Sequence, residues 1–197
     1  MARFSVHNHS SYFDLGDKII GYTPKSATTS IHRSLRTLAK PKISQQMVVK
    51  RRETVPVIVF VRHPLDRLVS AHAFFTRADR VNPGIPENFS DFVDFLLKKV
   101  RNRQDEHWIP QTDYHTYHKQ YLPTVHYPLE HINEIWPTIS RSKLERLNAN
   151  KDRPEWEPLF DSLSNEQQAG LLAYYADDIR VYEKALAEWR NWHTQQS

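Results

Sequence analysis

The sequence predicts an α/β fold in which a central parallel sheet lies between layers of helices. Two observations predict it. Short apolar runs with strand character alternate with segments of helical periodicity along the chain. Polar and basic segments directly follow the two clearest strands, at the ends where sheets of this kind bind ligands. With 197 residues and no internal repeat, the chain is expected to form one domain over residues 1–197.

The first strand is expected over residues 18–22, within the sequence "DKIIGYT". A polar loop follows, and "TTSIHRSLRTLA" then predicts a helix over 28–39. Residues 1–17 are expected to form an irregular lead-in before this strand. The segment 40–53, "KPKISQQMVVKRRE", is polar and basic and is expected to be a surface connection.

The second strand is expected within "TVPVIVFVR", residues 54–62, because a near-continuous β-branched run is typical of a parallel strand covered on both faces. This run stops at Arg62. Pro64 then suits the first turn of a helix, where its missing N–H costs nothing. Four apolar residues give this helix one buried stripe: Leu65, Leu68, Val69 and Phe75.

The middle of the chain is expected to add a helix and a third strand. Ser90 is expected to cap a helix that follows the loop 80–90, which is rich in Pro and Gly. The aromatic segment 105–123 is expected to be irregular. The sequence "TVHYPLEHINEIW", residues 124–136, is expected to pass from a short strand into a helix.

A long C-terminal helix is expected over 164–190. Ser164 and Gln167 have the spacing of a capping box at its start. Apolar residues at alternating spacings of three and four predict a stripe that faces the core. These residues are Leu172, Tyr175, Ile179, Tyr182, Leu186 and Trp189.

The composition limits the possible partners and compartments. Lys and Arg number 27 against 23 Asp and Glu, which gives a formal net charge of +4. Such a mild excess suits an anionic ligand but is far below that of a tail that coats nucleic acid. The absence of cysteine excludes disulfides and thiolate metal sites and fits a reducing compartment. No apolar run has the length of a signal peptide or a membrane span, so a soluble cytoplasmic protein that binds neither membrane nor nucleic acid is expected.

The segment "PKSATTS", residues 24–30, has the character of an anion-binding loop. It leads into a helix N-terminus, where unpaired backbone N–H groups and the helix dipole favour negative charge. Small residues let an anion approach, hydroxyls add donors, and the lysine adds a full charge. The residues expected to hold the anion are Lys25, Ser26, Ala27, Thr28, Thr29 and Ser30. The spacing differs from the Walker A pattern, and an ordinary helix start beside a surface lysine fits this segment equally well.

A second phosphate-binding element is expected within "VRHPLDRLVSA", residues 61–71. Arg62 ends a strand, and Ser70 lies about two helical turns further on. An arginine fork and a hydroxyl can grip a phosphate together. The alternative is that Arg62 pairs with Asp66 on the helix surface.

Together these two segments resemble the sulfotransferases that use 3′-phosphoadenosine 5′-phosphosulfate (PAPS), and the nearer resemblance is to the carbohydrate sulfotransferases. "PKSATTS" is similar to the family's 5′-phosphosulfate loop, and "VRHPLDRLVSA" is similar to its 3′-phosphate element. "HWIPQ", residues 107–111, resembles an element of the chondroitin and HNK-1 branch. "YPLEHI" and "YYADDIRVYEKAL" look like two later, less specific elements. The resemblance implies a P-loop-like three-layer domain. Luminal animal members of the family carry cysteines and a membrane anchor, which this sequence lacks, so a short soluble form of bacterial or viral type is expected.

The resemblance also implies a mechanism, in which a sulfuryl group moves from PAPS to an acceptor hydroxyl by in-line displacement without a metal ion. Lys25 would neutralise the leaving phosphate, residues 26–30 would hold the 5′ group, and Arg62 and Ser70 would hold the 3′-phosphate. A histidine would take the proton of the acceptor, which is expected to be a carbohydrate or another small molecule.

Two histidines qualify as the proton acceptor. His107 lies in the "HWIPQ" element, and His32 lies on the helix after the anion loop. The chain departs from the family at Ala27, where glycine is usual. Close approach of an anion is therefore expected only if Ala27 needs no positive φ.

Other functions compete with this interpretation. A nucleotide-dependent phosphotransferase of P-loop-like fold would need a carboxylate for Mg²⁺ at a strand end, whereas "VIVFVRHP" ends in a cation. A non-catalytic binder of anions or nucleic acid would explain the basic segment 40–53. It would not explain two separate phosphate elements that both follow strands.

Overall fold

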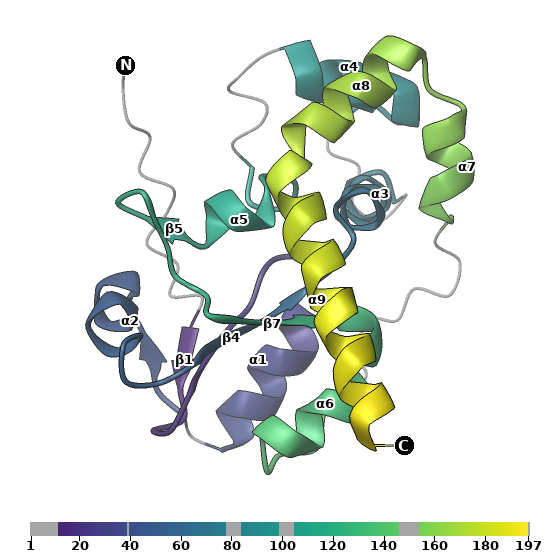
Figure 1. Ribbon diagram of the computed structural model, residues 1–197. Coiled ribbons are helices and arrows are strands. Elements are labelled where there is room, and N and C mark those ends of the chain that lie inside the picture. Colours follow the sequence, from purple (N-terminus) through teal and green to yellow (C-terminus); the bar gives the residue numbers. More distant parts are fainter. Residues whose placement is uncertain (1–11, 39, 78–83, 99–104, 146–153, 197) are drawn as a thin grey trace.

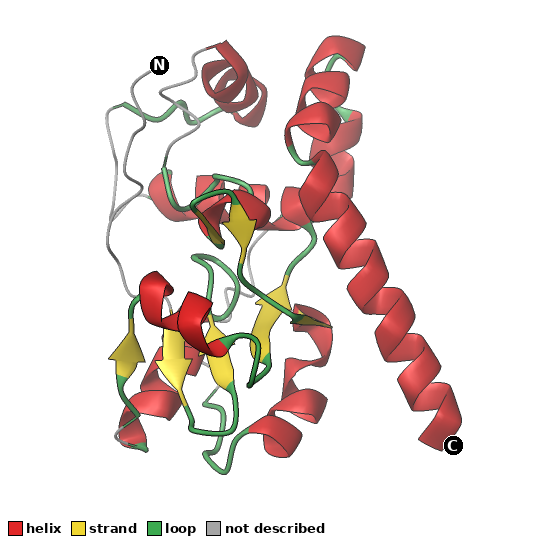
Figure 2. Cartoon of the chain, turned by 60° about the vertical axis from the view of Figure 1, so that its left-hand side comes forward, coloured by secondary structure: helices red, strands yellow, loops and turns green. Residues whose placement is uncertain are grey.

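The computed structural model describes residues 12–38, 40–77, 84–98, 105–145 and 154–196. A five-stranded sheet of order β3-β1-β2-β4-β7 lies at its centre, among helices (Figures 1 and 2). The mixed α/β architecture predicted from the sequence is confirmed. The strands are β1 (Tyr12–Asp14), β2 (Ile19–Gly21), β3 (Lys42–Ile43), β4 (Val57–Val61) and β7 (Val125–Pro128).

The sheet is parallel at its centre and mixed at one side. Strands β2, β4 and β7 run parallel to one another, whereas β1 is antiparallel to both β2 and β3. Strand β1 lies within the expected lead-in 1–17, so that prediction is wrong for residues 12–14; residues 1–11 lie outside the described part. A strand of three residues is too short to show an alternating pattern. Tyr12 and Phe13 nevertheless point to opposite faces of the sheet, and both are buried.

The segment 40–53 is also more ordered than the sequence predicts. It forms the edge strand β3 and the helix α2 (Gln45–Arg51), in place of a plain surface connection. The Ser44 hydroxyl caps α2 by accepting a hydrogen bond from the Met47 N–H at 3.3 Å. Val48 is the one buried residue of this helix, so the segment has too little apolar periodicity to be recognised from sequence.

Helices cover both faces of the sheet. One face packs against α1 (Thr28–Thr37) and α6 (Ile132–Ile139), and the opposite face packs against α2 and α9 (Ala176–Gln196). Successive residues of β4 alternate between these two faces, and all five are buried. This arrangement confirms the prediction of a strand covered on both sides.

Strands β2 and β4 place two loops at the same edge of the sheet. They are parallel neighbours, so the chain leaves both of them in the same direction. Strand β2 leads through residues 22–27 into α1, and β4 leads through Arg62 and His63 into α3 (Pro64–Phe75). Pro64 is the first residue of α3, as predicted.

A second group of helices packs around α3. The group comprises α4 (Phe89–Lys98), α7 (Trp156–Asp161) and α8 (Asn165–Tyr174), and it shares one apolar cluster with α3. The predicted cap of α4 is wrong by two residues. The Asn88 side-chain oxygen accepts from the N–H groups of Ser90 and Asp91 at 2.9 and 3.2 Å, so Asn88 is the cap.

The helix expected over 164–190 is divided into α8 and α9. Its capping box at Ser164 and Gln167 is confirmed. The division lies at Tyr175 (φ −104°, ψ 16°), a fully buried residue whose hydroxyl donates to the Trp108 carbonyl at 2.6 Å. The predicted apolar stripe therefore does not run continuously, and Leu172 is 44% exposed.

The segment 105–123 contains short regular elements where an irregular course was expected. These are α5 (Gln111–Tyr114) and a hairpin of β5 (Thr116–Tyr117) and β6 (Gln120–Tyr121). The predicted passage from strand to helix after residue 124 is confirmed by β7, the 3₁₀ helix η3 (Leu129–His131) and α6. Within the described residues, no helix combines the length and the apolar character needed to span a membrane.

Candidate active site

The loop between β2 and α1 turns through two residues in left-handed conformation. Lys25 has φ 68°, and Ala27, the N-cap of α1, has φ 56° and ψ 22°. The condition set for close approach of an anion, that Ala27 needs no positive φ, is therefore not met. The alanine side chain also provides no cap for α1. The loop reaches this conformation at a cost that glycine would not have.

Replacing Ala27 by glycine is expected to stabilise the protein by roughly 0.5–1 kcal/mol, because relief of the left-handed strain exceeds the entropy that glycine adds to the unfolded chain. Urea unfolding would measure this change. Ala73→Gly, within the helix α3, is a matched control that should destabilise by about 1 kcal/mol. A loss of stability in Ala27→Gly would show that Ala27 is not under backbone strain in the folded protein.

Two of the hydroxyls expected to bind an anion are engaged within the loop and its surroundings. The Thr28 hydroxyl donates to the Thr23 carbonyl at 2.5 Å. Ser26 is fully buried, and its hydroxyl donates to Oε1 of Gln111 at 3.2 Å. Thr29 is exposed and Ser30 is buried. An anion at this loop would therefore rely chiefly on backbone N–H groups and on the charge of Lys25.

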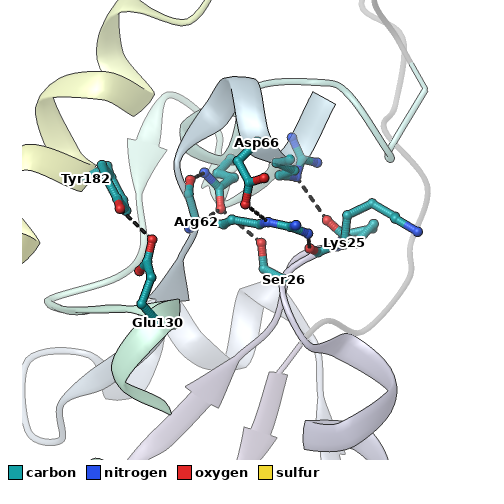
Figure 3. A network of polar contacts seen from close by, with 9 residues as sticks. Lys25, Ser26, Arg62, Asp66, Glu130 and Tyr182 are labelled. Atoms are coloured by element: carbon teal, nitrogen blue, oxygen red, sulfur yellow. Dashed lines mark hydrogen bonds and ion pairs between the residues drawn. The ribbon is translucent and has the colours of Figure 1, made fainter. Parts of the chain in front are cut away.

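Arg62 contacts the loop directly. Its Nη1 donates to the Lys25 carbonyl at 2.6 Å, and its Nε donates to Oδ2 of Asp66 at 2.7 Å (Figure 3). The pairing with Asp66 is thus present. These contacts use two of the five guanidinium N–H groups, which leaves up to three for a ligand. Ser70 is half-buried and lies one turn beyond Asp66 on the same face of α3, and Arg62 reaches Asp66 from the residues that precede this helix.

Gln111 links both loops to the C-terminal helix, a role that sequence reasoning missed. Its Nε2 donates to the Arg62 carbonyl at 2.8 Å, and its Oε1 accepts from the Arg62 N–H at 3.1 Å. The ladder between β4 and β7 ends at Val61, so this side chain takes the place of a strand partner. Buried Asp178 accepts from the backbone N–H groups of Gln111 and Thr112 at 2.7 and 2.8 Å.

His107 is oriented by a carboxylate that the sequence analysis did not single out. Its Nδ1 lies 2.7 Å from Oδ1 of Asp105. Burial alone would raise the pKa of Asp105, but hydrogen bonds from the His107 side chain and backbone lower it below the usual value. An ionised carboxylate only accepts, so Nδ1 carries the hydrogen and Nε2 is the acceptor nitrogen of the neutral ring.

Lys25 and His107 meet at one aromatic ring. The Lys25 ammonium lies 4.2 Å from the centroid of the Phe74 ring, and the His107 ring stacks on Phe74 with centroids 5.8 Å apart. Phe74 is on α3, one turn beyond Ser70. The structure therefore brings together two residues that lie 82 positions apart in the sequence.

His32 has different surroundings. Its ring packs edge-on against Phe13 and Tyr22, at centroid distances of 5.6 and 6.1 Å. Burial lowers its pKa, and the charges of Lys42 and Arg36 lower it further. His32 thus lies beside aromatic residues of β1 and the end of β2, whereas Lys25 and His107 lie at Phe74.

Buried His115 supports the start of the anion loop. Its Nε2 lies 2.8 Å from the Thr23 hydroxyl, and its Nδ1 lies 2.6 Å from the Tyr12 hydroxyl. Burial lowers the pKa of His115 to about 3, and the charges of His126 and Arg67 act in the same direction. The ring is therefore neutral in the folded protein at pH values where the unfolded chain already binds a proton.

The stability of the protein is expected to fall as the pH falls from about 6.5 towards 3, because the unfolded state binds the proton of His115 first. This one group contributes about 1.4 kcal/mol per pH unit. Urea unfolding between pH 7 and 4 would measure the slope. His115→Gln should reduce the slope by about this amount and leave the part that His126 contributes, whose pKa burial lowers to about 4. His193→Gln, at an exposed position, should leave the slope as it is, and an unchanged slope in His115→Gln would contradict this assignment.

Among the residues that the structure describes, no group of three or more His, Cys, Asp or Glu could hold a metal ion. The family model described as "Sulfotransferase family" matches residues 17–185, which is most of the chain. No curated protein and no solved structure matches the chain.

Proposed function

The chain belongs to the sulfotransferase family, and from that premise we propose that it transfers a sulfuryl group from PAPS to a carbohydrate hydroxyl. The observation that carries the proposal is the contact between the two loops. Nη1 of Arg62 lies 2.6 Å from the Lys25 carbonyl, while the Lys25 side chain extends away from Arg62 (Figure 3). Two cationic groups on adjoining loops suit the two phosphorylated ends of one donor.

The donor would lie across these loops. Arg62 and Ser70 bind its 3′-phosphate, which distinguishes PAPS from ordinary nucleotides. Lys25 and the backbone N–H groups of residues 27–30 bind its 5′-phosphosulfate at the start of α1, while the Ser26 N–H donates to the Thr23 carbonyl at 3.0 Å. The hydroxyls of Ser26 and Thr28 hold the loop in shape through their contacts with Gln111 and Thr23.

The transfer itself is an in-line displacement at sulfur. A bond forms between sulfur and the acceptor oxygen, and the bond from sulfur to the bridging oxygen of the donor breaks. The electron pair of that bond leaves with adenosine 3′,5′-bisphosphate, whose growing charge Lys25 neutralises. The acceptor proton passes to Nε2 of His107, and Asp105 stabilises the resulting imidazolium.

The finer assignments rest on the resemblance of short elements. The "HWIPQ" element supports a carbohydrate acceptor of the chondroitin and HNK-1 type. We further propose that the enzyme is cytoplasmic, that its source is bacterial or viral, and that it works without a metal ion. The family match favours sulfuryl transfer over phosphoryl transfer and over simple anion binding.

Calorimetry with two nucleotides tests the donor. Adenosine 3′,5′-bisphosphate is expected to bind at least about tenfold more tightly than adenosine 5′-phosphate, because a charge-assisted pair contributes about 1.5–3 kcal/mol. Arg62→Met should remove this preference. Arg33→Met, which removes an exposed arginine of α1, should retain it. Equal affinities in the unmodified protein would refute the proposal.

A further inference from the structure

A fully buried arginine lies between the two segments that carry Lys25 and His107. Arg67 is on α3, and its side chain is 0% exposed. Its Nε donates to the Pro24 carbonyl at 2.9 Å, and its Nη2 donates to the Glu106 carbonyl at 2.9 Å. Pro24 directly precedes Lys25 and Glu106 directly precedes His107, so one rigid group contacts the backbone beside both.

A third contact completes the arrangement. Nη1 of Arg67 donates to the Ile109 carbonyl at 2.7 Å, so the guanidinium binds the segment 106–109 on both sides of Trp108. Burial lowers the pKa of Arg67, yet a guanidinium remains charged in proteins. The planar fork fixes the directions of its N–H groups, which a lysine ammonium on a flexible stem cannot reproduce.

Burying the charge of Arg67 costs free energy that an apolar side chain at this position would not cost. Desolvating a cation in the interior is expensive, and here the three hydrogen bonds are made to neutral carbonyls. What the guanidinium offers in return is the fixed geometry of its N–H groups. A single planar group seated on α3 contacts both the loop 24–27 and the segment 106–109.

We infer that Arg67 is a positioning residue that sets the distance between Lys25 and His107. This inference rests on the proposed function. Lys25 stabilises the leaving group and His107 receives the acceptor proton, so a change in their spacing disturbs the transition state. The donor is held chiefly by Arg62, Ser70 and the start of α1, so its affinity depends little on Arg67. Arg67 therefore acts on kcat rather than on donor binding.

The test compares Arg67→Lys and Arg67→Met with Leu68→Ala, a fully buried position next to Arg67 in the same helix. Three quantities are measured at a temperature where each variant is folded. These are the unfolding free energy in urea, the Kd of adenosine 3′,5′-bisphosphate, and the turnover of PAPS at saturating donor. Turnover is followed as release of the bisphosphate, with water or a panel of polysaccharides as acceptor.

Arg67→Lys is expected to lower kcat about 100-fold, as a displacement of about 1 Å can do, while Kd changes less than about threefold. Leu68→Ala should lose stability and keep its kcat. If Arg67→Met fails to fold, Arg67→Lys still decides the matter, because it keeps the charge. An Arg67→Lys variant with the kcat of Leu68→Ala would overturn the inference. Failure of the unmodified protein to prefer the bisphosphate would instead overturn the proposed function.

Discussion

Lys25→Met is expected to lower kcat by about 10²–10³-fold, the effect of removing one group that stabilises charge in a transition state. Lys25 is the cation at the loop that precedes α1, and its ammonium lies over the Phe74 ring. Methionine keeps most of the length of the side chain and can pack on the same ring. Stability should therefore change by no more than about 1 kcal/mol, the worth of an exposed cation–π contact.

The measurement is PAPS turnover at saturating donor, together with urea unfolding of the same samples. Lys50→Met is the matched control, because Lys50 is an exposed lysine near the end of α2. It should behave as the unmodified protein in both experiments. Unchanged turnover in Lys25→Met would remove this residue from the mechanism, whatever the donor affinity.

His107→Ala is expected to lower kcat by about 10²–10⁴-fold, the usual contribution of a general base. Asp105→Asn should also lower kcat, because it removes the carboxylate that holds Nδ1 of His107 and stabilises the imidazolium. His32→Ala is the natural comparison. Its ring packs against Phe13 and Tyr22, away from the Phe74 ring that Lys25 and His107 share.

Rates at saturating donor would separate these two histidines. The structure favours His107, since a carboxylate orients its ring and Lys25 shares its aromatic neighbour. A slow His32→Ala variant beside an active His107→Ala variant would reverse the assignment. Full activity in both would exclude both as the base. The unfolding free energies of all three variants show whether any loss is one of folding.

The order of the main elements could be read from the sequence, because helix periods, strand runs and caps are properties of neighbouring residues. Strands β2 and β4, the start of α3 at Pro64 and the capping box at Ser164 are examples. The two loop motifs were also visible, since each is a short local pattern. The expectation that both follow strand ends, on one edge of the sheet, needed only their parallel order.

The tertiary structure alone decided how these local pieces meet. Gln111 and Asp178 are 67 residues apart, and Arg67 contacts carbonyls up to 43 residues away. Such contacts depend on how helices pack on the sheet, which no local pattern records. The left-handed conformation of Ala27 also depends on tertiary structure, because the surrounding contacts impose a conformation that alanine by itself disfavours. The sequence therefore determined the elements and the loop motifs, whereas packing between distant segments decided which side chains share a site.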